Sequence, residues 1–351
     1  MTITEFSTAL YDFHKSNQKI NSLNDLMVQA KDFFLKNLND LDEAELASAS
    51  ISGSNPNEKK NNLMTSCETI ICASNDAITR YDNSSGTDGF DDFYEIFFPS
   101  DKAAPAANIK LIRRNSNFYR MRATKTEKYE YKFFKRNELF VIPKELDSLV
   151  GRLRFNDEGK PSLYLGNSLY IVWEECRRPP FDLVNFCRFS NERSLKVMSI
   201  YIEQRMNTLG EFIMGYFTLL TCMKTDDDKK HQFQYVVSNM FMKCLIRNIQ
   251  RKGDIDGIEY LSSRRYDCND LILNPRTRDK LYAFPQKQIV TKGVCPQLVG
   301  MFKMTEPRTF FLYKVHRFFD WSIAKTSKYQ DSIFGEIENQ LLHEHLDFSN
   351  A

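Results

Sequence analysis

The sequence predicts an α+β protein, and three observations lead to that class. Apolar residues recur at helical spacing near the N-terminus, short β-like runs follow residue 108, and helical spacing returns after residue 191. The 351 residues leave room for two domains, or for one domain with a large appendage. Apolar side chains make up 42% of the chain, which is enough to bury a core and to exclude wholesale disorder.

Residues 1–107 are predicted to form a helical N-terminal region. One stripe of apolar residues runs from Phe6 to Leu38, and Ser22 is placed to cap a helix within it. Polar stretches at 52–62 and 82–89 predict loops between helices. A stretch with two prolines, residues 99–108, predicts the boundary to the next domain.

Residues 108–320 are predicted to form a second domain that mixes strands and helices. Short β-like runs predict strands at 118–121, 138–142, 162–165, 169–173, 257–261 and 270–273. Residues 191–250 are helical by pattern, with a charged break at 224–230 between two helices. Residues 321–351 are predicted to form a C-terminal helical tail, because aromatic and aliphatic residues recur at helical spacing between 309 and 346.

The charge and the longest apolar stretch exclude several classes of protein. The net charge of +2 lacks the strong basic bias of a chain that coats nucleic acid. Residues 1–16 show no basic segment followed by an apolar run, so we expect no secretory signal. The stretch from Leu209 to Met223 is too short to cross a bilayer of about 30 Å. We therefore expect a soluble, cytoplasmic protein without a membrane partner.

Cysteine and histidine spacing predicts neither a disulfide framework nor a metal site. The eight cysteines are scattered without a Cys-x-x-Cys pair, which is typical of reduced, mostly buried thiols. His343 and His345 flank Glu344, and this spacing on a helix would point the two imidazoles in different directions. We expect no bound metal.

Residues 151–180 are the densest candidate for a functional site. Arg154 precedes an Asn-Asp-Glu-Gly turn signal, and the following strand contains Tyr164. A second apolar run then ends on two carboxylates, Glu174 and Glu175. This order can bring a guanidinium, a phenol and a carboxylate towards one cleft. The alternative is a surface arginine, a core tyrosine and a solvated pair of carboxylates.

A second candidate segment begins at the Asp-Gly turn before Gly257. The strand that follows would present Tyr260, Ser262 and Arg264 on one side. Ser262 is not part of a Gly-x-Ser-x-Gly elbow and has no nearby histidine, which argues against a serine hydrolase. The alternative is that Ser262 is a structural serine.

Residues 110–310 resemble the RES-domain family, which is named for an arginine, a glutamate and a serine. Five segments carry the resemblance in order: NFYRMRA (117–123), ELFVIPKE (138–145), RFNDEG (154–159), PSLYLGNSLYIVWEE (161–175) and DGIEYLSS (256–263). They are similar to the opening strand of the family, the segment before its arginine turn, that turn, its Leu-Tyr-Leu strand with the glutamate beyond it, and its late serine strand.

The resemblance implies three catalytic residues. The family arginine falls on Arg154, five residues before the glycine of the turn. The family glutamate falls on Glu175, with Glu174 as the alternative, and the family serine falls on Ser262, with Ser263 as the alternative. Cleavage of an N-glycosidic bond passes through an oxocarbenium-like state, which a carboxylate such as Glu175 would stabilise.

The resemblance also implies two substrate-binding residues, Arg120 and Tyr164. An arginine offers paired donors that suit a pyrophosphate, which is the role expected of Arg120 beside Arg154. The ring of Tyr164 would stack on, or its hydroxyl would bond to, the nicotinamide riboside.

The resemblance implies a fold similar to ADP-ribosyltransferases and an enzyme that cleaves NAD+ between nicotinamide and ribose. The acceptor would be phosphate, as in an NAD+ phosphorylase, or water, as in an NAD+ glycohydrolase. NAD+ is then a substrate, and no cofactor is implied. The expected output is depletion of NAD+ by a toxin or defence effector, with an antitoxin or regulatory protein as partner, and the family includes homodimers. Unlike short members, this chain has a long N-terminal extension and a helical insertion before the serine strand.

Other functions stay open at this point. One is transfer of ADP-ribose to a protein. Another is a nucleic-acid-binding module, because basic and aromatic residues interleave at 125–137, although a β-hairpin with a solvated face has the same pattern. A third is a scaffold that has kept the fold without catalysis.

Overall fold

The computed structural model describes residues 1–13, 20–100, 106–123, 142, 144–156, 158–179, 184–191, 193–222, 232–251, 253–262, 280–285, 297–303, 334–335 and 338–339. These residues form helices and a mixed β-sheet, so the predicted α+β class is confirmed. The chain divides into two compact units, and each unit is assembled from three stretches of sequence. The first unit comprises residues 1–110, 152–157 and 196–263, and the second comprises residues 111–151, 158–195 and 264–351.

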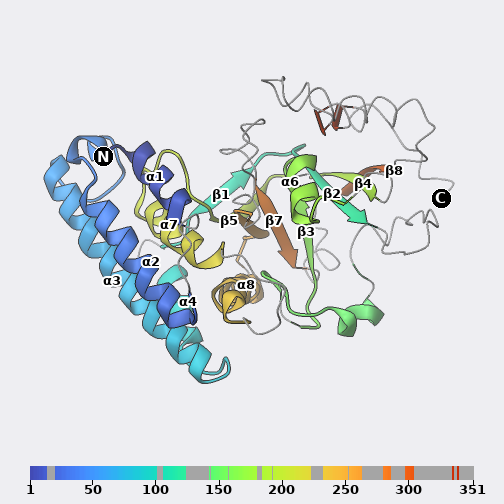
Figure 1. Cartoon of the computed structure of the whole chain (residues 1–351), viewed down its shortest axis with the longest axis horizontal. Helices are drawn as coiled ribbons and strands as arrows, with labels where there is room; N and C mark the ends of the chain where they lie inside the picture. Colours follow the sequence, from blue (N-terminus) through green and yellow to red (C-terminus); the bar gives the residue numbers. More distant parts are fainter. Residues whose placement is uncertain are drawn as a thin grey trace. The chain divides into compact units, whose positions relative to one another are not determined.

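The first unit begins with helices, as the sequence predicts. They are α1 (Ile3–Asp12), α2 (Leu23–Asn39), the short 3-10 helix η2 (Glu43–Leu46), α3 (Pro56–Asn83) and α4 (Phe90–Phe97). Figure 1 shows α1, α2 and α3 side by side. Ser22 is the predicted N-cap of α2: its hydroxyl accepts a hydrogen bond from the Asp25 N–H at 3.1 Å.

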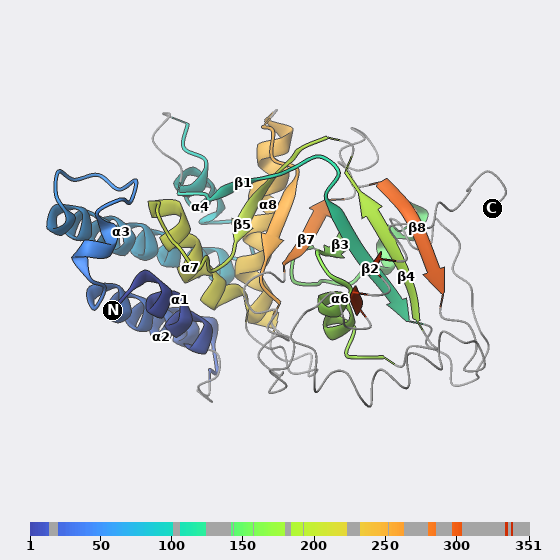
Figure 2. The same cartoon turned by 90° about the horizontal axis from the view of Figure 1, so that it is seen from above.

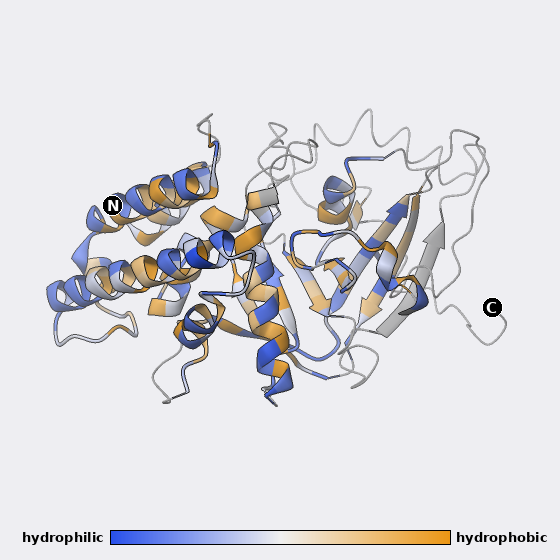
Figure 3. Cartoon of the chain, turned by 90° about the horizontal axis from the view of Figure 1, so that it is seen from below, coloured by the Kyte–Doolittle hydropathy of each residue, from blue (hydrophilic) through white to orange (hydrophobic). Residues whose placement is uncertain are grey.

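Part of the loop predicted at 52–62 is wrong, because α3 already begins at Pro56. Asn55 caps this helix through a bond from the Glu58 N–H to its side chain at 2.9 Å, and proline suits the first helical position. Residues 56–62 of that polar stretch belong to the first turns of α3, whereas residues 52–55 precede the helix. Hydrophilic and hydrophobic stretches alternate along the helices near the N-terminus (Figure 3).

Two later helices complete the core of the first unit. They are α7 (Leu209–Thr221), which is apolar on nearly all sides, and α8 (Val236–Gln250), which follows the short 3-10 helix η5 (Gln232–Tyr235). Four fully buried phenylalanines from α4, α7 and α8 pack mostly edge to face, with ring centroids 4.9–6.0 Å apart: Phe93, Phe97, Phe217 and Phe241. Among the described residues, no helix combines the length and the apolar character needed to span a membrane.

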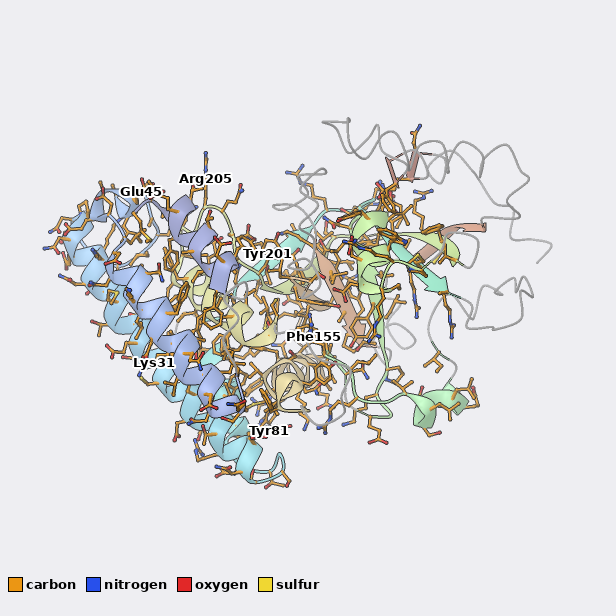
Figure 4. The ribbon with its side chains drawn as sticks, in the orientation of Figure 1. Lys31, Glu45, Tyr81, Phe155, Tyr201 and Arg205 are labelled. Atoms are coloured by element: carbon orange, nitrogen blue, oxygen red, sulfur yellow. The ribbon has the colours of Figure 1, made fainter. Side chains whose placement is uncertain are left out.

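The surface where α8 meets α3 and α4 is built from cations and aromatic rings. The ammonium of Lys243 lies 4.9 Å from the ring centre of Tyr81, which is labelled in Figure 4. One turn further along α8, the Arg247 guanidinium lies 4.7 Å from the ring of Tyr94, and it pairs with Asp91. These cation–π contacts and the ion pair stabilise the packing of α8 against α3 and α4.

The strands of the first unit lie in the order β1 (Ile109–Ile112), β5 (Leu195–Ile200) and β6 (Gly257–Tyr260). Of these strands, the second half of β1 and the first residue of β5 are assigned to the second unit. β5 and β6 run parallel, with Val197 opposite Gly257 and Ile200 opposite Tyr260. β6 confirms the strand predicted at 257–261. The helical prediction for the whole of 191–250 is wrong, because β5 lies within it and α7 begins only at Leu209. Nearly every residue of β5 is buried, and such a run lacks the alternation that identifies a strand.

The strands of the second unit lie in the order β7 (Leu281–Pro285), β3 (Ser162–Gly166), β2 (Asn117–Ala123), β4 (Val184–Ser190) and β8 (Gln297–Lys303), and each neighbouring pair is antiparallel. Figure 2 shows β2, β4 and β8 side by side. The strands predicted at 118–121 and 162–165 are confirmed as β2 and β3. Except for Ile142, the predicted strands at 138–142 and 270–273 lie outside the described residues.

The strand predicted at 169–173 is wrong, because this run forms helix α6 (Leu169–Glu175). Ser168 has extended backbone and caps the helix by accepting a bond from the Ile171 N–H at 3.3 Å. The run is too short for its apolar pattern to distinguish a strand from one buried face of a helix. The same unit also contains a short 3-10 helix, η3 (Lys144–Leu149).

The predicted domain bounds at 107 and 320 stay a prediction. The first unit includes residues on both sides of residue 107, since 152–157 and 196–263 join the N-terminal helices. The charged break predicted at 224–230 is outside the described residues. Of the predicted tail, the structure describes only 334–335 and 338–339, and these residues are helical.

Candidate functional site

The five predicted site residues are divided between the two units. The first unit contains Arg154 and Ser262, and the second contains Arg120, Tyr164 and Glu175. Arg120 and Tyr164 lie on strands, whereas Arg154 lies in a turn and Glu175 ends helix α6.

In the first unit, the turn that carries Arg154 packs against the strand that leads to Ser262. Leu153 and Asn156 on either side of Arg154 exchange two backbone hydrogen bonds, at 3.2 and 3.5 Å. The ring of Phe155, labelled in Figure 4, is fully buried and lies 4.4 Å from the ring of Tyr260 at the end of β6. The structure therefore brings together two segments that are far apart in sequence.

Arg154 and Ser262 differ in exposure within this arrangement. The side chain of Arg154 is half-buried, whereas Ser262, two residues beyond Tyr260, is 0% exposed. Ser263, the alternative to Ser262, lies outside the described residues.

The glycine that ends the predicted arginine turn lies in the second unit. Gly159 has a φ of 67°, in the left-handed region that favours glycine, and its N–H donates to the Val150 carbonyl at 3.0 Å. The turn signal after Arg154 is therefore confirmed.

Strand register decides which candidates of the second unit share a face of the sheet. Tyr119 of β2 lies opposite Gly166 of β3 and opposite Arg188 of β4, and directly opposite residues point to the same face. Tyr164 is two residues before Gly166, so it lies on this face too. We call this side, defined by Tyr119, Tyr164 and Arg188, the Tyr164 face. Arg120 follows Tyr119 and lies on the opposite face, so the register does not bring Arg120 and Tyr164 together.

Helix α6 packs on the Tyr164 face. A Cβ atom added to Gly166 would lie 2.6 Å from a methyl carbon of Val172 and 2.7 Å from one of Ile171. The helix therefore approaches the sheet as closely as a glycine permits. This contact positions the end of α6, which carries Glu174 and Glu175.

The two adjacent glutamates have different surroundings. Glu174 is 4% exposed, and its two carboxylate oxygens accept bonds from the Arg178 Nε at 3.0 and 2.9 Å. The guanidinium of Arg178 also lies 5.7 Å from the ring centre of Trp173. Glu174 is thus engaged in an ion pair with Arg178, which lies just beyond the C-terminal end of α6. Glu175 is half-buried.

The C-terminal tail contacts α6, which the sequence did not predict. Phe334 is 1% exposed, and its ring lies 5.4 Å from the rings of both Tyr170 and Trp173. The Glu338 carboxylate accepts a bond from the Leu169 N–H, the first of the helix, at 2.6 Å. Phe334 and Glu338 are four residues apart, and this spacing could have indicated one shared helix face.

Sequence reasoning also missed buried carboxylates beside the serine strand. Glu259 of β6 accepts a bond from the Ser199 hydroxyl at 2.8 Å, and both residues are buried. Asp256 accepts a bond from the Lys196 N–H at 2.9 Å and donates its own N–H to the Lys196 carbonyl at 2.7 Å. These contacts connect β5 and β6, which gives both carboxylates a structural role.

The described thiols and acidic groups offer no metal centre. No group of three His, Cys, Asp or Glu side chains in the described ranges is arranged to hold a metal ion. The six cysteines that the structure describes are free, and four of them are buried. Burial raises the pKa of Cys187 to about 12, so this thiol stays protonated at neutral pH. The segment 125–137, on which the nucleic-acid alternative depends, lies outside the described residues.

Replacing Gly166 by alanine is expected to displace α6 from the sheet. The added methyl group would overlap Val172 and Ile171, and overpacking of this kind costs about 1–3 kcal/mol. We expect a lower urea midpoint, measured by circular dichroism. Gly151→Ala is the control, since nothing lies within 4 Å of its Cβ position. Equal midpoints for the two variants would contradict the close approach of α6.

The chain is similar to a protein of Bacillus subtilis (strain 168) named "Putative toxin YopC". The two are 24% identical over 230 residues, which cover 60% of this chain and 50% of the relative. The chain thus spans about half the length of the curated relative it matches. No family model and no solved structure matches the chain.

Proposed function

We propose that this protein cleaves NAD+ at the bond between nicotinamide and ribose, and that it acts as a toxin or defence effector by depleting NAD+. The observation that carries the proposal is the contact between Phe155 and Tyr260. It joins the arginine turn to the serine strand, two segments of the RES-like pattern that must meet if the resemblance is correct. The similarity to a protein named as a putative toxin supports the toxin role alone and not the reaction.

The proposed reaction breaks the C1′–N bond of the nicotinamide riboside, and the electron pair of that bond leaves with nicotinamide. Nicotinamide departs as a neutral molecule, so the step needs no strong general acid. The ribose develops positive charge, which the Glu175 carboxylate stabilises. A phosphate oxygen then bonds to C1′ and gives ADP-ribose 1-phosphate, or water adds and gives ADP-ribose and a proton.

Three other candidate residues bind the substrate in this proposal. Arg154 provides guanidinium donors for the pyrophosphate, and Ser262 donates a hydrogen bond to a phosphate or ribose oxygen. Arg120 has no role in this proposal, because it lies on the sheet face opposite Tyr164. Tyr164 contacts the nicotinamide riboside through its ring or its hydroxyl. Because NAD+ is an intracellular metabolite, we propose that the protein acts in the cytoplasm. A protein that destroys NAD+ there would need control, which we propose an antitoxin or another regulatory protein provides.

The test is incubation of the purified chain with NAD+, with and without inorganic phosphate, followed by mass spectrometry of the products. Free nicotinamide together with ADP-ribose 1-phosphate would identify an NAD+ phosphorylase, and plain ADP-ribose would identify a glycohydrolase. A protein that gains the mass of ADP-ribose would identify a transferase acting on protein. NAD+ that stays intact under all conditions would refute the proposal.

A further inference from the structure

Arg188 of β4 places a positive charge on the Tyr164 face that no carboxylate in the described part of the chain pairs with. Its Nη1 donates to the side-chain oxygen of Asn117 at 2.9 Å, and Asn117 is a neutral partner. Its Nε is buried and has no hydrogen-bond acceptor among the described residues. Burial also lowers the pKa of the guanidinium, as expected when water is removed from a cation.

A structural role alone explains this arginine poorly. A guanidinium carries five N–H donors, and a half-buried charge is costly unless its donors meet acceptors. One amide oxygen satisfies a single donor of Arg188 and provides no opposite charge. An anionic ligand would supply both the missing acceptor and the missing charge.

The neighbours of Arg188 suit such a ligand. Tyr119 lies directly opposite Arg188 in the strand register and is 4% exposed. Burial and the nearby carboxylate of Glu338 raise the pKa of Tyr119, so its hydroxyl keeps its proton and can donate it in a hydrogen bond. The carboxylate of Glu338 is itself engaged by the Leu169 N–H. Asn117, Tyr119 and Arg188 stand on paired strands, which hold them more rigidly than loops would.

We propose that Arg188 and Tyr119 form a binding site for a phosphoryl group, with Asn117 orienting the guanidinium. A guanidinium can donate two parallel hydrogen bonds to two phosphoryl oxygens, and the Tyr119 hydroxyl adds a further donor. The site deepens the proposed function and rests on it for the identity of the ligand. The phosphoryl group belongs either to the pyrophosphate of NAD+ or to the inorganic phosphate that accepts the ADP-ribosyl group.

Isothermal titration calorimetry of the full chain tests this site with two probes, inorganic phosphate and ADP-ribose. ADP-ribose carries the pyrophosphate but has no nicotinamide bond to cleave. Arg188→Gln is expected to weaken binding of at least one probe by about 10- to 100-fold, the worth of one or two hydrogen bonds to a charged group. Weaker binding of phosphate alone would identify the acceptor site, and weaker binding of ADP-ribose would identify the pyrophosphate site.

Arg193→Gln is the matched control, because it removes the same charge from an exposed arginine that follows β4. Tyr119→Phe removes only the hydroxyl and is expected to weaken the same probe by about 3- to 10-fold. Wild-type affinity for both probes in folded Arg188→Gln protein would overturn the site. Binding of the probes requires no turnover, so the two proposals can fail separately. If binding depends on Arg188 but the protein leaves NAD+ intact in the cleavage assay, the cleavage reaction is refuted and the phosphoryl site is retained.

Discussion

Replacing Glu175 by glutamine is expected to lower the rate of NAD+ cleavage by at least about 10²-fold, the loss seen when one preorganised charge-stabilising group is removed. The amide has nearly the same shape as the carboxylate, but it cannot balance the positive charge that develops on the ribose. Glu175 is half-buried at the end of α6, so the fold should survive the change. The rate of nicotinamide release measures the effect, and a thermal melt checks the fold.

Glu174→Gln is the matched control for this experiment. Glu174 pairs with Arg178 just beyond the end of α6, and its loss should lower the thermal midpoint more than the rate of cleavage. If Glu174→Gln abolished turnover and Glu175→Gln did not, the catalytic role would move to Glu174. Full activity in both variants would remove the carboxylate from the mechanism.

Replacing Phe217 by alanine is expected to lower the free energy of unfolding by about 3–5 kcal/mol, the usual cost of removing a buried aromatic ring. Phe217 is fully buried, and its ring lies 5.1 Å from Phe241 and 5.3 Å from Phe97. The change would leave a cavity where α4, α7 and α8 meet. Urea titration followed by circular dichroism measures the loss.

Phe217→Leu provides the comparison, because leucine keeps most of the buried volume at this position. We expect a clearly smaller loss of stability than for alanine. If the alanine variant unfolded at the wild-type urea concentration, the aromatic cluster could not be the main core of the first unit.

Local signals predicted the parts of the fold that depend on local contacts. Ser22 identified the start of α2, because a cap acts through a bond three residues away. The polar run at the start of α3 was misleading, since a helix needs only one apolar stripe, and Asn55 and Pro56 already marked where the helix begins. The strand β5 was missed because full burial removes the alternation by which a strand is recognised.

The candidate site was only partly predictable for a related reason. The sequence predicted Arg154, Glu175 and Ser262 as catalytic residues. It could not show that Arg120 and Tyr164 lie on opposite faces of the sheet. That separation follows from the register between β2 and β3, which is set by contacts between distant segments. Arg188 was missed for the same reason, because its partner Asn117 is 71 residues away in the chain.

The interleaving of the two units bears on how the protein is made. The chain passes from one unit to the other at residues 110, 151, 157, 195 and 263, so no single cut separates them. During synthesis, β6 can pair with β5 only after residues up to 260 have left the ribosome. The hydrogen bond between the Leu169 N–H of α6 and the Glu338 carboxylate forms later still, since the two residues are 169 positions apart. The helix that carries Glu175 acquires its full support only late in synthesis, so a nascent chain lacks part of the structure on which the proposed activity depends.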